Sequence, residues 1–230
     1  MNSFIFIILF LLVLLCAVRG QTDTDTALCG FIAGTNIGSL SQYSQWACTA
    51  VGETVGDPCS PVWTGLSCSG GLVEQLAMIS VAGFSGSLPS SLSQLTALIS
   101  VDLTEVELFG SIPSNLDQLT SLTRLSLSET SLTGSIPSSL EYLTKLLTLE
   151  LGYNSLTGTI PNQLGALSAV SYISLCNNSL TGTFVRLFCG VQYICIPYVY
   201  VVPVAHPLFV SFRFTLSVSL YFLSPRVHSH

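Results

Sequence analysis

Hydrophobic and polar positions in the middle of the chain repeat with a period of 24 residues. One glycine recurs in each repeat, at Gly86, Gly110, Gly134, Gly158 and Gly182. A proline follows three residues after the first four of these, at Pro89, Pro113, Pro137 and Pro161. Leucines alternate with polar residues over stretches such as 125–127 and 149–151, which predicts one short strand per repeat with alternate side chains in the core. Fixed self-similarity at this length is typical of a solenoid.

The repeats fit the pattern L-x-x-L-x-L-x-x-N-x-L. Copies of it, the first of them degenerate, occupy the segments 77–84, 98–108, 122–132, 146–156 and 170–180. With the continuation Leu-Thr-Gly-Ser-Ile-Pro-Ser-Ser-Leu, residues 29–184 resemble the plant-type, 24-residue class of the leucine-rich repeats. The resemblance implies an α/β-type solenoid: a right-handed coil of about five repeats, with short parallel strands on the concave face and 3-10 helices or loops on the convex side.

The asparagine of the pattern is present in only two copies. Asn154 and Asn178 are expected to turn inward and to hydrogen-bond backbone groups that the coil leaves unpaired. Thr130 can do this in part, whereas Val106 and Ala82 cannot. We therefore expect the early turns of the solenoid to be looser than the later ones.

Residues 21–72 are predicted to cap the N-terminal end, because a repeat cannot bury its hydrophobic face alone. The stretch 57–68 resembles the D-P-C-x-W-x-G-x-x-C cap that precedes plant-type repeats. By this resemblance Cys59 pairs with Cys68, and Trp63 covers the first coil. Cys29 and Cys48 are then the natural second pair, although four cysteines allow three connectivities. A zinc site is the rival interpretation of these cysteines.

The first twenty residues predict a secretory signal peptide. They hold an apolar run over residues 4–15, followed by small residues near a cleavage site after Gly20. An uncleaved anchor is the alternative. Secretion implies an oxidising compartment, so the cysteines are read first as disulfides and the protein is expected to be extracellular or at the cell surface.

The apolar tail, residues 185–230, contains no further repeat element, and three interpretations of it stay open. The first is a membrane anchor, although three prolines interrupt the apolar run. The second is a β-rich cap stapled by a disulfide between Cys189 and Cys195. The third is read-through of a retained intron, because Val185-Arg186 can be encoded by a splice-donor-like string at the point where the repeat fails.

Charge and composition exclude several classes of function. Residues 21–184 hold two basic and twelve acidic residues, a formal net charge of −10, which argues against nucleic-acid binding. All three histidines lie in the last 25 residues, so the acidic core lacks a histidine-based catalytic pair. Glu105 and Glu129 form an acidic pair one strand apart, but such a pair on a solenoid is usually a solvated ridge. We expect no enzyme activity, cofactor or metal.

The variable positions around each strand form four columns on the concave face, where solenoids bind partners. The first column holds Ser100, Arg124, Thr148 and Tyr172. The second holds Asp102, Ser126, Glu150 and Ser174. The third holds Thr104, Ser128, Gly152 and Cys176. The fourth holds Glu105, Glu129, Tyr153 and Asn177.

Seven residues of these columns are the predicted ligand-binding site. Arg124, Tyr153 and Tyr172 are residue types that dominate binding energies at interfaces. The acids Asp102, Glu105, Glu129 and Glu150 make the face acidic. Such a face would steer a basic peptide or protein towards it. Asn177 begins an N-x-S sequon and is a predicted glycosylation site, while Cys176 is interpreted as a free thiol or a partner of Cys189.

The resemblance to plant-type receptor ectodomains implies an extracellular interaction module that recognises a peptide, protein or glycan as a receptor-like protein or short co-receptor. An alternative is a secreted inhibitor of a cell-wall hydrolase, similar to the polygalacturonase-inhibiting proteins. A structural surface protein without a specific ligand is the third possibility, since one repeat pattern serves many functions.

Overall fold

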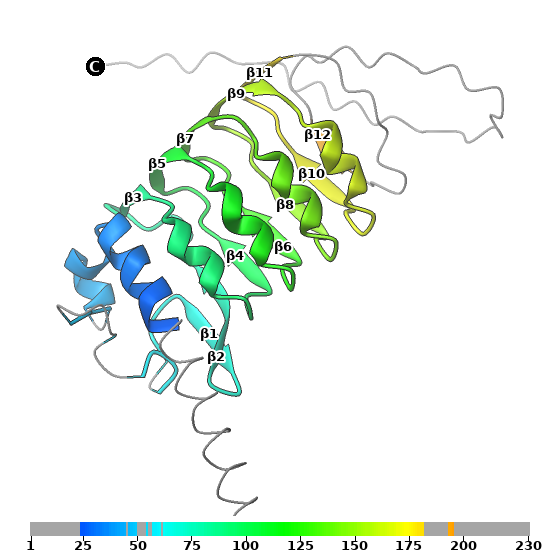
Figure 1. Ribbon diagram of the computed structural model, residues 1–230. Coiled ribbons are helices and arrows are strands. Elements are labelled where there is room, and N and C mark those ends of the chain that lie inside the picture. The colour runs from blue at the N-terminus through cyan, green and yellow to red at the C-terminus, as the bar shows by residue number, and fades with distance from the viewer. Residues whose placement is uncertain are drawn as a thin grey trace, which may run out of the picture.

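A computed structural model describes residues 24–181, except 45, 50–53, 55–56 and 61, together with residues 193–195. Short parallel strands, one from each repeat, form a sheet along one side of an elongated coil (Figure 1). The predicted signal peptide and nearly all of the predicted tail lie outside the described residues. No helix in the described part of the chain is long and apolar enough to cross a bilayer.

The concave sheet has seven strands in the order β1-β2-β4-β6-β8-β10-β12. Its first pair is antiparallel and all later neighbours are parallel and in register. The strands are β1 (Leu66–Ser69), β2 (Leu72–Ala77), β4 (Ser100–Asp102), β6 (Arg124–Ser126), β8 (Thr148–Glu150), β10 (Tyr172–Ser174) and β12 (Tyr193–Cys195). This sheet confirms the predicted fold class. β12 lies in the predicted tail, where the sequence pattern indicated no further repeat element.

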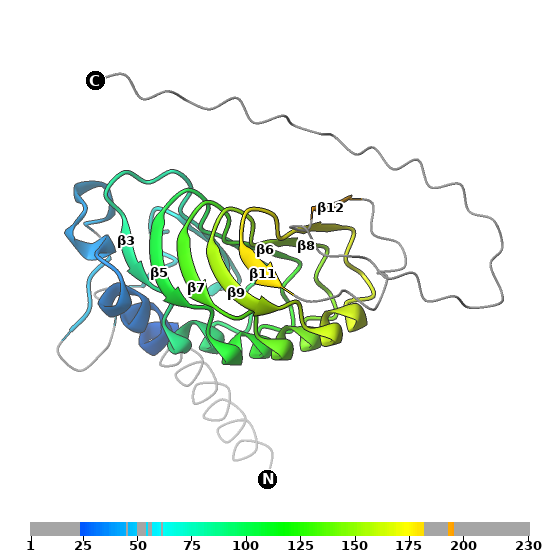
Figure 2. The same ribbon diagram turned by 90° about the horizontal axis from the view of Figure 1, so that it is seen from above.

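A second sheet, which the sequence analysis did not predict, lies beside the first. Its five parallel strands run in the order β11-β9-β7-β5-β3 (Figure 2). They are β3 (Ser85–Ser87), β5 (Glu107–Ser111), β7 (Ser131–Gly134), β9 (Ser155–Thr159) and β11 (Ser179–Thr181). Each contains part of the Leu-Thr-Gly-Ser or related segment that was interpreted as a simple bend.

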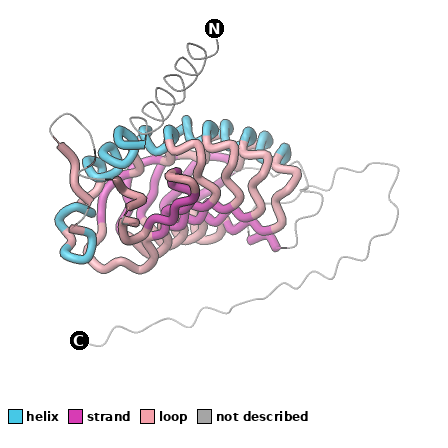
Figure 3. Tube along the Cα trace, turned by 90° about the horizontal axis from the view of Figure 1, so that it is seen from below, coloured by secondary structure: helices cyan, strands magenta, loops and turns pink. Residues whose placement is uncertain are grey.

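Short 3-10 helices line the convex side (Figure 3). Those of the repeats are η3 (Ser90–Gln94), η4 (Ser114–Gln118), η5 (Ser138–Tyr142) and η6 (Asn162–Ala166). Each begins directly after a repeat proline, whose fixed φ and extended ψ direct the chain into the turn. Each also buries one leucine, the residue that the 24-residue period places there.

The N-terminal cap packs onto the first repeat through a helix over residues 24–34, η1 (Ile37–Ser39), η2 (Ser41–Tyr43) and the β1–β2 hairpin. Phe31 stacks on Phe84, and the ring centroids of Trp46 and Trp63 lie 5.3 Å apart. The structure pairs Cys29 with Cys48 and Cys59 with Cys68. All four cysteines are therefore used in disulfides rather than in a metal site.

Gly86 shows how closely the cap helix approaches the first repeat. A Cβ atom at this position would lie 2.4 Å from the carbonyl oxygen of Gly34. Any side chain would therefore push the cap away from β3. The repeat glycine that the sequence presents as a periodic landmark is, at this first copy, also a docking requirement.

The asparagine ladder has the predicted inward direction. The side-chain amide of Asn154 donates to the carbonyl of Leu127 at 2.8 Å, and Asn178 repeats this contact with Leu151 at 2.8 Å. Ala82, by contrast, is exposed and does not point into the coil. Its task is taken by Asn36 of the cap, which accepts from the Ser85 N–H at 2.8 Å and donates to the Gly83 carbonyl at 2.6 Å.

We expect backbone amides around Val106 to exchange with solvent faster than those around Asn154. Val106 is buried but apolar, and the Leu108 N–H donates to the Val106 carbonyl at 2.9 Å instead of to a side-chain amide. Amides near Ala82 should also exchange faster, with the exception of Ser85, which Asn36 holds. Hydrogen exchange followed by mass spectrometry checks this, and uniform protection along the repeats would contradict it.

Candidate functional site

The concave face is built by the in-register pairing of β4, β6, β8 and β10. Cα partners run from Ser100 to Arg124, Thr148 and Tyr172, and in the next column from Asp102 to Ser126, Glu150 and Ser174. These are the first two predicted columns. Side chains of one column therefore stand about 4.8 Å apart along the sheet, close enough for charged neighbours to meet.

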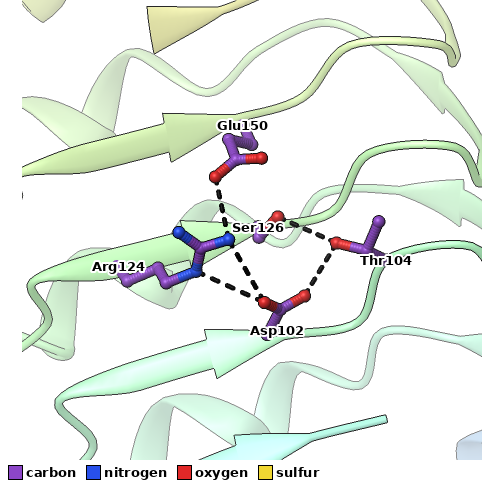
Figure 4. Close-up of polar contacts among 5 residues, drawn as sticks. All are labelled: Asp102, Thr104, Arg124, Ser126 and Glu150. Atoms are coloured by element: carbon purple, nitrogen blue, oxygen red, sulfur yellow. Dashed lines mark hydrogen bonds and ion pairs between the residues drawn. The ribbon is translucent and has the colours of Figure 1, made fainter. Parts of the chain in front are cut away.

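Arg124 lies between two acids of the second column (Figure 4). Its Nη2 atom lies 3.3 Å from Asp102 Oδ2 and 2.9 Å from Glu150 Oε1, and its Nε donates to Asp102 Oδ2 at 3.3 Å. The Thr104 hydroxyl donates to Asp102 Oδ1 at 2.7 Å and lies 2.9 Å from the Ser126 hydroxyl. The result is one network that spans three strands.

This network changes the expected charge of the face. The Asp102 and Glu150 side chains are only 14% and 20% exposed, and both are paired with Arg124. Glu105 and Glu129 are exposed and lie outside this network. The acidity that the sequence analysis assigned to the whole face is therefore concentrated in the fourth column.

Replacing Arg124 by glutamine should lower the free energy of unfolding by about 1 kcal/mol, because two acids would lose their cation while the exposed guanidinium limits the gain from each pair. Added salt should reduce the difference between the variant and the wild type. Urea unfolding at low and high ionic strength measures both effects. A difference that does not change with salt would mean that Arg124 acts through packing rather than charge.

The fourth column, which we call the rim column, has an unusual backbone. Glu105, Glu129, Tyr153 and Asn177 all have φ between 52° and 57°, and Ser80 precedes them with φ 52°. Left-handed backbone is uncommon for residues other than glycine, although asparagine tolerates it well. The repeating conformation projects successive side chains along one edge of the concave face. No sequence pattern indicated it.

The aromatic residues predicted for the site lie at its C-terminal half. Tyr153 is 55% exposed in the rim column, and Tyr172 is half-buried in β10. Between them the face has a floor of small residues, where a Cβ at Gly152 would lie 2.8 Å from the Ser174 hydroxyl. Cys176 is disulfide-bonded, so the free-thiol interpretation of this residue is wrong.

The outward side of the second sheet is a regular array of hydroxyl groups that the sequence analysis missed. The exposed residues of its last three strands, which we call the hydroxyl face, are Ser131, Thr133, Ser155, Thr157, Thr159, Ser179 and Thr181. These three strands contain no charged residue. The recurring Leu-Thr-Gly-Ser/Thr segment was the available signal.

The threonine rotamers of the hydroxyl face are fixed by the preceding repeat. The hydroxyls of Thr133, Thr157 and Thr181 donate to glycine carbonyls one rung earlier at 3.2, 3.4 and 3.3 Å. Next to this face an open groove is lined by residues that include Ser114, Ser135 and Asn162. The whole surface is polar and uncharged, in contrast to the rim column.

The described residues contain no group of three or more His, Cys, Asp or Glu side chains that could hold a metal ion. The acidic pair Glu105 and Glu129 lies in the rim column, where a Ser80 hydroxyl donates to Glu105. These acids stand on an exposed edge, which is the geometry of a solvated ridge.

Comparison with known proteins agrees with this geometry. The family described as "Leucine rich repeat" matches residues 120–180. A chain in the crystal structure of the BIR3–SERK2 complex from Arabidopsis thaliana is 33% identical, with a TM-score of 0.60, and 69% of this chain covers 83% of it. No curated protein matches the sequence.

Two further solved structures are similar over a smaller share of their own length. A plant ice-binding protein is 28% identical with a TM-score of 0.61, over 71% of this chain and 50% of that chain. The Arabidopsis receptor kinase HAESA, in complex with the peptide hormone IDA and the co-receptor SERK1, gives a match at 30% identity and a TM-score of 0.58, over 72% of this chain and 26% of that one.

The coil of parallel strands, proline-started 3-10 helices and buried asparagines defines a leucine-rich-repeat solenoid, a class of protein-interaction module. The identity and coverage of the first match show the family more closely. The chain belongs to the plant-type leucine-rich-repeat proteins.

Proposed function

We propose that the protein is an extracellular receptor-like or co-receptor-like module that binds a peptide or protein partner on its concave face. The observation that carries the proposal is the surface formed by the Arg124 network and the exposed rim column. It combines a fixed cation, unpaired acids and a large exposed aromatic ring at Tyr153. The HAESA structure, which contains a peptide hormone and a co-receptor, supports this type of partner.

The rim column favours a partner with basic residues. Glu105 and Glu129 are exposed, stand on adjacent rungs and lie beside Tyr153, whose ring can receive a cation or an apolar side chain. The second-column acids contribute less attraction, because Arg124 already neutralises them. A lysine or arginine of the partner would therefore pair along the rim rather than in the centre of the face.

The test is a screen of extracellular peptides against the immobilised full-length protein, followed by affinity measurements with two charge-reversal variants. Glu129→Lys should weaken a true ligand by about three- to tenfold, because it replaces an attraction by a repulsion at the rim. Glu107→Lys is the matched control, since it makes the same charge change on an exposed position of β5 in the second sheet.

Equal loss of affinity in both variants would mean that ligands respond to net charge and not to the rim column. Equal affinity in both would remove the rim column from the binding site. An inhibition assay with cell-wall hydrolases separates the proposed receptor-like role from an inhibitor. Membrane fractionation adds a second criterion, because a protein released freely into the medium would not support a receptor-like role.

The hydroxyl face favours a second candidate function, adsorption to ice. It presents exposed hydroxyls in rows about 4.8 Å apart with no charge and with threonine rotamers fixed by hydrogen bonds. A regular, rigid array of this kind suits a partner that is itself a lattice. The similarity to a plant ice-binding protein supports this candidate.

Inhibition of ice recrystallisation tests the second candidate. The wild type should slow crystal growth, and Thr157→Tyr, in the middle of the hydroxyl face, should abolish the effect. Thr144→Tyr is the control, since Thr144 is exposed outside the second sheet, next to η5. A wild-type protein that leaves ice growth unchanged, or a Thr157→Tyr variant that keeps full activity, would end this candidate.

A further inference from the structure

Asn177 lies in the turn between β10 and β11, at the C-terminal end of the rim column. With Asn178 and Ser179 it forms the one N-x-S/T sequon in the sequence. Its side chain is exposed, and no described residue hydrogen-bonds its amide group. Its backbone is held, because its carbonyl accepts from the Asn154 N–H at 3.1 Å.

The next residue shows that the two asparagines have different tasks. The Asn178 amide points inward and donates to the carbonyls of Leu151, Leu175 and Cys176 at 2.8, 3.1 and 3.3 Å. Its Oδ1 accepts from the Leu156 N–H at 2.9 Å. Asn178 therefore serves the fold and Asn177 presents a free amide to solvent. Ser179, the hydroxyl residue of the sequon, is also exposed.

We infer that Asn177 carries an N-linked glycan in the mature protein. In the transfer, Nδ2 of Asn177 bonds to the anomeric carbon of a lipid-linked oligosaccharide diphosphate. The bond from that carbon to the diphosphate oxygen breaks, the lipid diphosphate leaves with the electron pair, and the amide loses one proton. The acceptor nitrogen is on the outer surface of the turn, so the core does not have to open.

The glycan would also limit the partner surface. Tyr153 is the preceding member of the rim column, about one strand spacing or 4.8 Å away, and its N–H donates to the Cys176 carbonyl at 2.8 Å. A sugar on Asn177 therefore covers the C-terminal side of Tyr153 and leaves Glu105 and Glu129 open. The consequence for a partner rests on the proposed function, whereas the modification itself does not.

Intact-mass measurement tests the modification. The full chain is expressed in eukaryotic cells behind a cleavable leader of known function, and the secreted protein is weighed before and after amidase treatment. We expect loss of one glycan mass and an aspartate at position 177 in peptide maps. Asn177→Gln and Ser179→Ala should lack the glycan, and Ser179→Thr should keep it. Secreted wild type without a glycan mass would overturn the inference.

Radical footprinting tests the shielding without any ligand. Tyr153 and Tyr142 are 55% and 58% exposed, and Tyr142 lies on η5 on the convex side. The glycosylated protein should label Tyr153 at least about twofold less than the Ser179→Ala variant, because an N-glycan is bulky, with Tyr142 unchanged. Equal labelling of Tyr153 in both forms would refute the shielding. Failure of partner binding would leave both measurements unaffected.

Discussion

Replacing Trp46 by alanine should lower the free energy of unfolding by about 3–5 kcal/mol, because it removes a large buried side chain from the centre of the cap. Trp46 is 1% exposed, and its ring centroid lies 5.9 Å from Phe31 and 5.3 Å from Trp63. Its Nε1–H also donates to the Thr64 carbonyl at 3.0 Å. Chemical unfolding monitored by circular dichroism measures the change.

Trp46→Phe is the control, since it keeps an aromatic ring and loses the indole N–H. We expect a loss of about 1–3 kcal/mol from the unpaired Thr64 carbonyl and the reduced volume. The alanine variant should also speed amide exchange in β2 and β4 more than in β8 and β10, because each repeat is stabilised by its neighbours. A Trp46→Ala variant as stable as the phenylalanine variant would mean that the cap packs without this ring.

The concave sheet could be predicted because each of its residues has a periodic reason. The leucine pattern places Leu125 and Leu149 in the core once per repeat, and both are buried in the structure. Identical rungs then pair in register, so the columns of the binding face follow from the spacing alone. Arg124, Glu150 and their neighbours could be placed in the correct columns for this reason.

Contacts that cross from one rung or segment to another could not be predicted in the same way. Asn36 replaces the missing asparagine at Ala82 from 47 and 49 residues away, and nothing in its local sequence shows this. The second sheet was missed because its strands are short and contain glycine, which lowers β propensity. The pairing of Arg124 with Asp102 and Glu150 depends on rotamers that column membership does not specify.

Asn154→Ala should destabilise the protein by about 2–4 kcal/mol, because it leaves buried backbone groups without partners. The Asn154 amide donates to the carbonyls of Leu127, Leu151 and Gly152 at 2.8, 3.2 and 3.2 Å, and its Oδ1 accepts from the Leu132 N–H at 3.0 Å. Urea unfolding measures the loss. Asn162→Ala, at the exposed first residue of η6, should cost less than about 0.5 kcal/mol.

A double-mutant cycle with Thr130 then separates the ladder from simple loss of packing. The Thr130 hydroxyl donates to Asn154 Oδ1 and to the Leu127 carbonyl, the latter at 3.3 Å, so the two side chains share one acceptor and belong to one network. Thr130→Val and Asn154→Ala should therefore be non-additive by about 0.5–3 kcal/mol. Additive losses would mean that Asn154 supports each rung alone, and the looser early turns would then need a cause other than the broken ladder.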